Sequence, residues 1–223
     1  MRKLYALLLF FLFSYGGIKA QEISMKQLDS LAFKIKHYPK TDTVYINMRL
    51  DYVRNSLFLK PTDTTIIRYC LNNIALSKKI DYPKGVALSY LRLGVAYNQL
   101  YSNADMAVEN YQNALKIIEH QPNLVKYRFE AIYNTATIFY EQKEYNTAIR
   151  YYKKAIDDGK PRFQVYSALA NVYGSTSKSD SAIYFYKKAI LISKKEKALI
   201  YTANDLSNLS LVYVGLNKTA EAK

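Results

Sequence analysis

The residues best suited to catalysis or metal binding are few and far apart in this chain. The two histidines, His37 and His120, lie in distant parts of the sequence, and neither has a Cys, Asp or Glu at a spacing typical of metal ligands. No phosphate-binding glycine loop, zinc-protease motif or strand-turn-helix nucleophile motif occurs. The sequence therefore predicts no catalytic residues, no metal site and no cofactor, and we expect the protein not to be an enzyme.

The only cysteine, Cys70, lies on an apolar helical stripe with Ile66 and Ile74. No basic or imidazole partner that would activate its thiol is evident nearby in the sequence. A single cysteine cannot form an intramolecular disulfide, so the fold must depend on helix packing, which the 50% hydrophobic content allows. The pattern predicts a small, buried and unreactive side chain.

Residues 1–20 have the organisation of a signal peptide. Arg2 and Lys3 precede an apolar run over residues 4–13, and small residues follow as far as Ala20. The run is shorter than the ~20 apolar residues that a membrane-spanning helix needs. We expect cleavage after Ala20 and export to the periplasm or the extracellular space, with an uncleaved anchor as the alternative.

Two segments further along the chain, residues 148–155 and 182–189, have the same pattern, and their regular spacing indicates a repeat array. Each has a small residue, an aromatic residue four positions later and a second small residue after three more, which places all three on one helical face. Each segment follows a helix-like stretch in which large residues flank one small residue. That stretch recurs four times, at Tyr90, Leu93, Gly94 and Tyr97; Ile132, Thr135, Ala136 and Phe139; Tyr166, Leu169, Ala170 and Tyr173; and Leu206, Leu209, Ser210 and Tyr213.

This combination resembles the tetratricopeptide repeat, in which a W-x2-L-G-x2-Y helix precedes an A-x3-F-x2-A helix. The nearest match is Leu93-Gly94 followed by Tyr97, and the Trp of the signature is replaced throughout, because the chain has no Trp. The resemblance implies an all-α fold, a right-handed superhelical stack (α-solenoid) of antiparallel helix hairpins. The small residues allow helices to approach within ~8–10 Å, and neighbouring hairpins must stack to bury their apolar faces.

The expected organisation is a single domain after the signal peptide. It begins with an amphipathic helix within residues 21–40 and a degenerate hairpin within residues 41–84. The repeat array then occupies residues 85–223, with repeats at about 86–122, 129–160, 163–198 and 200–223. Because the last repeat lacks most of its second helix, we expect an incomplete array that frays or self-associates at this end, as in a fragment of a longer protein.

The chain is strongly basic, with a net charge of +14 at pH 7, of which residues 1–20 supply three charges. Such a charge is compatible with nucleic acid or an anionic surface as the partner. However, the lysine pairs 153–154 and 187–188 lie on the second helix of each hairpin, which forms the outer side in repeats of this family. We therefore expect a solvated outer face and no nucleic-acid binding by this segment, and anionic-surface binding remains as a weaker alternative.

The resemblance also implies that the first helices of the hairpins line a groove that binds a protein or peptide. Uncharged polar and aromatic side chains prevail among the residues expected there, and such groups suit the backbone of an extended peptide. The predicted groove residues are Arg92, Asn98, Tyr133, Asn134, Thr137, Tyr140, Gln164, Asn171 and Asn208.

Two functions follow as hypotheses. The first is a non-catalytic, exported module that mediates protein–protein or peptide binding through the groove. The second is the extracytoplasmic sensor portion of a longer transmembrane histidine kinase or helix-turn-helix regulator, because a signal sequence followed by irregular Tyr- and Asn-rich repeats is similar to such signalling proteins. The second hypothesis needs a longer parent chain with a transmembrane helix after the repeats.

Overall fold

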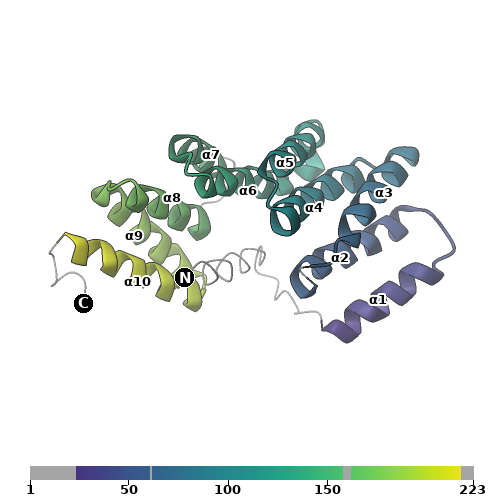
Figure 1. The fold of residues 1–223 in the computed structure, drawn as a ribbon, viewed down its shortest axis with the longest axis horizontal. Coiled ribbons are helices and arrows are strands. Elements are labelled where there is room, and N and C mark those ends of the chain that lie inside the picture. The colour runs from purple at the N-terminus through teal and green to yellow at the C-terminus, as the bar shows by residue number, and fades with distance from the viewer. Residues whose placement is uncertain (1–23, 61, 158–161, 217–223) are drawn as a thin grey trace. The chain divides into compact units, whose positions relative to one another are not determined.

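The computed structural model describes residues 24–60, 62–157 and 162–216, and within these ranges the regular structure is entirely helical (Figure 1). The expected all-α fold of antiparallel helix hairpins is confirmed. We expected one continuous domain, but the chain divides between Tyr127 and Arg128 into two compact units. No helix within the described ranges combines the length and apolar character needed to cross a membrane.

Within residues 24–60 and 62–127, the first unit contains five α-helices and a final 3-10 helix, Pro122–Tyr127. Consecutive α-helices pack against each other, and α2 also contacts α4. The α-helices are α1 (Met25–His37), α2 (Thr43–Leu59), α3 (Thr65–Lys79), α4 (Pro83–Tyr101) and α5 (Ala104–Glu119).

The side chain of Ser24 starts α1 by accepting a hydrogen bond from the backbone N–H of Gln27, whose own side chain accepts from the N–H of Ser24. This reciprocal capping box satisfies two backbone donors that would otherwise lack partners. Leu28 and Ile35 of α1 are buried in a cluster with Tyr52 of α2. The amphipathic helix expected near the N-terminal end is therefore part of the packed unit.

Gly94 lies where α4 and α5 pack closely together. A Cβ atom added at this position would lie 2.6 Å from Cε1 of Tyr111, so the aromatic ring occupies the space that any side chain would need. Cys70 of α3 is fully buried, as expected, and this burial raises the pKa of its thiol to about 12. The thiol is thus a packing group and not a nucleophile.

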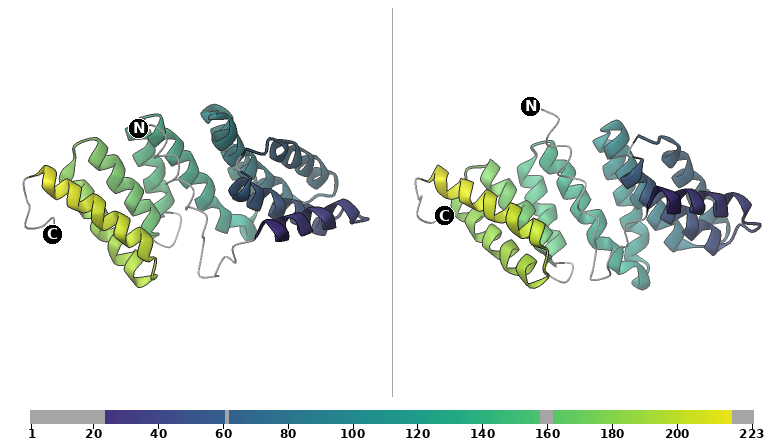
Figure 2. Two further views of the ribbon diagram at one scale, coloured as in Figure 1. Left: turned by 60° about the horizontal axis from the view of Figure 1, so that its bottom comes forward. Right: turned by 90° about the horizontal axis from the view of Figure 1, so that it is seen from below.

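In the described part of the second unit, five α-helices follow one another, and each packs against the next (Figures 1 and 2). Its helices are α6 (Arg128–Glu141), α7 (Tyr145–Asp157), α8 (Phe163–Ser175), α9 (Ser179–Lys195) and α10 (Leu199–Gly215). The small residues of the repeat pattern on α6 to α9 are buried where helices meet, as predicted, whereas Ser210 of α10 is partly exposed. The buried ones are Ala136, Ala148, Ala155, Ala170, Ala182 and Ala189.

The turns between these helices also repeat. Lys143 lies in the α6–α7 turn and Ser177 in the α8–α9 turn, each in the left-handed conformation with φ of 63° and 55°. This conformation ends a helix and lets the chain reverse its direction in a tight turn, although residues other than Gly and Asn seldom adopt it. Asn103 caps α5 through its side chain, which accepts from the backbone N–H of Met106. Lys178 takes the N-cap position of α9.

Leu206 was expected in the core of the last first helix, but it is 45% exposed. The buried side of α10 carries Thr202, Asp205, Leu209 and Tyr213 instead. Leu209 and Tyr213 are buried against α9 as predicted, so only Leu206 departs from the expected stripe, at the edge of this contact. The incomplete second helix expected for the last repeat lies outside the described residues.

Candidate functional site

The three first helices of the second unit, α6, α8 and α10, are linked to one another by side-chain hydrogen bonds. The hydroxyls of Tyr140 on α6 and Ser175 on α8 are 3.3 Å apart. The hydroxyl of Ser167 on α8 donates to Oδ2 of Asp205 on α10 at 2.7 Å. The solvent-facing side of these three helices forms one surface, called the first-helix surface below.

Tyrosines of the second helices reach across to polar side chains of the first helices at equivalent places. The hydroxyl of Tyr152 on α7 is 3.2 Å from Oγ1 of Thr137 on α6. The hydroxyl of Tyr186 on α9 donates to Oδ1 of Asn171 on α8 at 2.5 Å. Both pairs have the same separation in sequence and occupy equivalent positions in successive hairpins, so the repeat reproduces a hydrogen bond as well as a packing pattern.

These tyrosines are held as neutral hydrogen-bonding groups. Burial is the main cause that raises the pKa of Tyr152 and of Tyr186 above the ordinary value, so both hydroxyls remain protonated. A buried hydroxyl needs a partner, and Thr137 and Asn171 provide one. Both polar side chains are partly exposed, so each has one side bound within the protein and one side open to a ligand.

Asp205 is the carboxylate on this side of the unit that the sequence analysis missed. It is 4% exposed, and burial raises its pKa to about 6, against the opposing effect of the hydrogen bond from Ser167. One signal could have revealed it, because Asp205 is the only charged residue in the 17 residues of α10. An isolated acid on an otherwise uncharged helix indicates a specific role or a specific partner.

Most predicted groove residues of the second unit do lie on the first-helix surface. They are partly exposed on the three helices, namely Asn134, Thr137, Tyr140, Gln164, Asn171 and Asn208. Asn98 is partly exposed on α4 of the first unit. Whether these side chains contact a ligand remains a prediction.

Two predicted groove residues are corrected by their burial. Tyr133 is 6% exposed, with its ring stacked on Phe129 at 5.6 Å and tilted against Tyr152 at the same distance between centroids. An aromatic ring among other rings gains more from the core than from water, so Tyr133 holds α6 against α7 and does not offer its ring to a ligand. Arg92 is 9% exposed and is likewise mostly covered.

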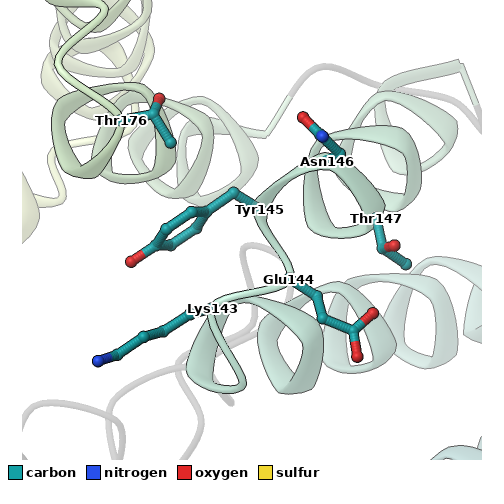
Figure 3. A pocket seen from close by; sticks show the side chains of 6 residues that line it. All are labelled: Lys143, Glu144, Tyr145, Asn146, Thr147 and Thr176. Carbon is teal, nitrogen blue, oxygen red and sulfur yellow. The ribbon is translucent and has the colours of Figure 1, made fainter.

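A shallow depression beside the α6–α7 turn is shown in Figure 3. It is lined by six residues, Lys143, Glu144, Tyr145, Asn146, Thr147 and Thr176. Lys143 and Tyr145 extend to one side, whereas Glu144 points to the other, so no acid and base converge on a common point. The described ranges also contain no group of His, Cys, Asp or Glu side chains that could hold a metal ion.

The sequence pattern of the tetratricopeptide repeat family matches residues 129–157 and 163–196, which correspond to the α6–α7 and α8–α9 hairpins. These two hairpins are tetratricopeptide repeats. Such repeats are generally non-catalytic modules for protein–protein interaction, which agrees with the geometry of the second unit. Comparison with curated protein sequences gives no match.

Solved structures with the same fold have low sequence identity to this chain. BtubC (BKLC) from P. vanneervenii is 18% identical with a TM-score of 0.74, and the match covers 88% of this chain and 85% of that one. A signal transduction ATPase with numerous domains from Pyrococcus horikoshii, which has a tetratricopeptide repeat sensor, is 15% identical with a TM-score of 0.75. That match covers 88% of this chain but only 32% of the ATPase. These similarities establish the fold and leave the ligand to be argued from the side chains.

Proposed function

We propose that this chain is a non-catalytic module that binds an extended peptide segment of a partner protein on the first-helix surface. The observation that carries the proposal is the ordered row of uncharged polar groups on α6, α8 and α10. Thr137 and Asn171 are fixed in this row by Tyr152 and Tyr186.

The chemistry of this row fits a peptide backbone. An amide or hydroxyl side chain can both donate to a C=O and accept from an N–H, which are the two groups that an extended peptide presents. Side chains already fixed by hydrogen bonds lose less conformational freedom when a ligand binds. The polar side chains recur from one hairpin to the next, as the N–H and C=O groups of an extended peptide recur along its length.

A random-peptide library selected against the purified chain supplies the probe for a test. The affinity of one selected peptide is then measured for the wild type and for two double variants. Gln164→Ala/Asn204→Ala removes a partly exposed amide of α8 and an exposed amide of α10 from the first-helix surface, and Lys153→Ala/Lys187→Ala removes two exposed lysines from α7 and α9. We expect the first variant to lose at least ~1 kcal/mol of binding free energy, a loss of about fivefold or more in affinity, and the lysine variant to change it little. The reverse result would reject groove binding in favour of electrostatic binding to the outer face.

We also propose that the chain is exported and acts in the periplasm or outside the cell. The support is the basic start at Arg2 and Lys3, the apolar run of residues 4–13 and the small residue Ala20, all of which lie outside the described residues. N-terminal sequencing of the protein recovered from its native cells should find a start at or near Gln21. Recovery of protein that begins at Met1 would contradict this proposal.

A sensor region within a signalling protein is the second candidate. The observation in its favour is the P. horikoshii ATPase, in which a tetratricopeptide repeat region of the same fold is the sensor. In this role the first-helix surface would bind a signal-bearing peptide, and the partner would be a histidine kinase or a helix-turn-helix regulator in the same polypeptide. Sequencing the native transcript and the mature polypeptide tests this directly, because a kinase or DNA-binding domain on the same polypeptide is required.

A further inference from the structure

Asp205 is a buried carboxylate that has no cationic partner in the described part of the chain. It is 4% exposed, its Oδ2 accepts the hydrogen bond from Ser167, and no described residue forms an ion pair with it. Proteins seldom enclose a carboxylate in this way unless a cation compensates its charge. Within the described ranges that compensating charge is missing.

The second oxygen of this carboxylate, Oδ1, is open to solvent. No described residue donates a hydrogen bond to it, and it is not among the described polar atoms that are both enclosed and without a partner. The side chains of Tyr201 and Asn208, about one turn before and after Asp205 on the same helix, are partly exposed, as is Ser167 on α8. A thin ligand group can therefore reach Oδ1 from the first-helix surface.

Hydroxyl groups from two other helices of the second unit lie near the same carboxylate. Burial is the main cause that raises the pKa of Tyr133 on α6 and of Tyr186 on α9, and the negative charge of Asp205 raises both further. Such an effect on both phenols requires their hydroxyls to lie close to the carboxylate. Because a hydroxyl oxygen can also accept a hydrogen bond, side chains from α6, α8, α9 and α10 place possible acceptors around one point.

The charges of the second unit are divided between its two sets of helices. The first helices α6, α8 and α10 contain one Arg and three acidic residues, whereas the second helices α7 and α9 contain seven basic and two acidic residues. In a chain with a net charge of +14, the first helices are thus the negative part of this unit. A positively charged ligand is attracted to this side and repelled by the other.

We propose that the peptide bound on the first-helix surface carries a lysine or arginine side chain whose cation pairs with Asp205. This inference rests on the proposed function and names the chemistry of its ligand. A long, thin side chain can bring its charge to an almost buried carboxylate while the peptide backbone stays on the surface. Folding has already removed most of the water around Asp205, so an incoming cation meets a fixed charge that need not be dehydrated again.

Selection of one random-peptide library on the wild type and on Asp205→Asn in parallel gives the first test. Peptides selected by the wild type should share a Lys or Arg at one position of their alignment, and peptides selected by Asp205→Asn should not. Asp180→Asn, at an exposed aspartate of α9, is the matched control, because it changes the net charge equally and should still select the basic position. Urea unfolding shows whether both variants are folded.

A double-mutant cycle with one peptide from the wild-type selection gives the second test. The peptide is synthesised with an acetylated N-terminus, so that its side chains are the only source of positive charge. A second form replaces the basic residue by a neutral analogue of similar shape, norleucine for Lys or citrulline for Arg. In titration calorimetry the neutral form should bind the wild type and Asp180→Asn at least ~10-fold more weakly, whereas Asp205→Asn should distinguish the two forms by less than ~2-fold.

The inference is overturned if the wild-type peptides share no basic residue, or if the neutral form loses as much affinity for Asp205→Asn as for the wild type. The double variant Gln164→Ala/Asn204→Ala separates this failure from a failure of the proposed function. A peptide that this double variant binds weakly, but that shows no coupling to Asp205, would keep the proposed function and reject the basic ligand. A selection without any binder, or a binder indifferent to the double variant, would reject both.

Discussion

The hydroxyl of Ser167 on α8 donates a 2.7 Å hydrogen bond to the buried carboxylate of Asp205 on α10. This bond joins two first helices that belong to successive hairpins. It only partly offsets the loss of water around the carboxylate, whose pKa is raised to about 6 by burial. The contact is thus specific in geometry but costly when Asp205 is ionised.

Asp205 should make stability depend on pH between about 4 and 6. Because the folded pKa lies above the unfolded value, the folded state binds a proton more tightly, and the free energy of unfolding falls as pH rises through this interval. Asp205→Asn keeps an oxygen that can accept from Ser167 and removes the charge. We expect it to stabilise the protein by roughly 1–3 kcal/mol at pH 7.5 and by much less at pH 4.

Urea unfolding of the wild type and of Asp205→Asn at several pH values measures this difference. Asp157→Asn, at an exposed aspartate of α7, is the control and should change stability by less than ~0.5 kcal/mol at each pH. A stability difference between Asp205→Asn and the wild type that stays constant from pH 4 to pH 7.5 would show that Asp205 is not desolvated in solution.

Asn171 should stabilise the fold through Tyr186, independently of any ligand. Asn171→Ala leaves the largely buried Tyr186 hydroxyl without this acceptor, which we expect to cost ~1–3 kcal/mol. In the background Tyr186→Phe, where no hydroxyl needs a partner, the same substitution should cost clearly less. A double-mutant cycle followed by chemical unfolding gives the coupling energy, and additive effects would refute the hydrogen bond.

Ala155 should tolerate no larger side chain, because it is almost fully buried on α7. Ala155→Leu should cost ~1–3 kcal/mol by overpacking. The adjacent Lys154 is exposed, and Lys154→Leu should change stability by less than ~0.5 kcal/mol. Equal urea midpoints for the two variants would contradict the helical phase of α7.

Replacing each of two helical glycines by alanine should change the stability of the protein in opposite directions. At Gly94 the new Cβ would meet the ring of Tyr111 at 2.6 Å, so Gly94→Ala should destabilise the first unit, by roughly 1–3 kcal/mol. At Gly174 nothing lies within 4 Å, so Gly174→Ala should stabilise the protein by roughly 0.4–1 kcal/mol through higher helix propensity. Thermal unfolding shows whether each substitution raises or lowers the melting temperature. A stabilising Gly94→Ala would mean that Tyr111 packs elsewhere.

The sequence by itself determined the hairpin fold and the close contacts of the second unit. The regular spacing between Ala148 and Ala182 can be read directly, because a small residue at a fixed helical position is needed wherever two backbones approach. The burial of Cys70 followed from its apolar neighbours for a similar reason. Each of these features depends on residues that are near in sequence or that repeat.

Only the tertiary structure decided which polar and aromatic side chains of the first helices reach solvent. Tyr133 is drawn inward by the rings of Phe129 and Tyr152, although its neighbours on α6 gave it a place in the predicted groove. Asp205 is buried and Leu206 exposed because the contact with α9 sets the rotation of α10. A helical repeat pattern specifies the side that packs against its own hairpin. The surroundings of the other side are set by helices that fold against it from elsewhere in the chain, and these do not appear in the local sequence.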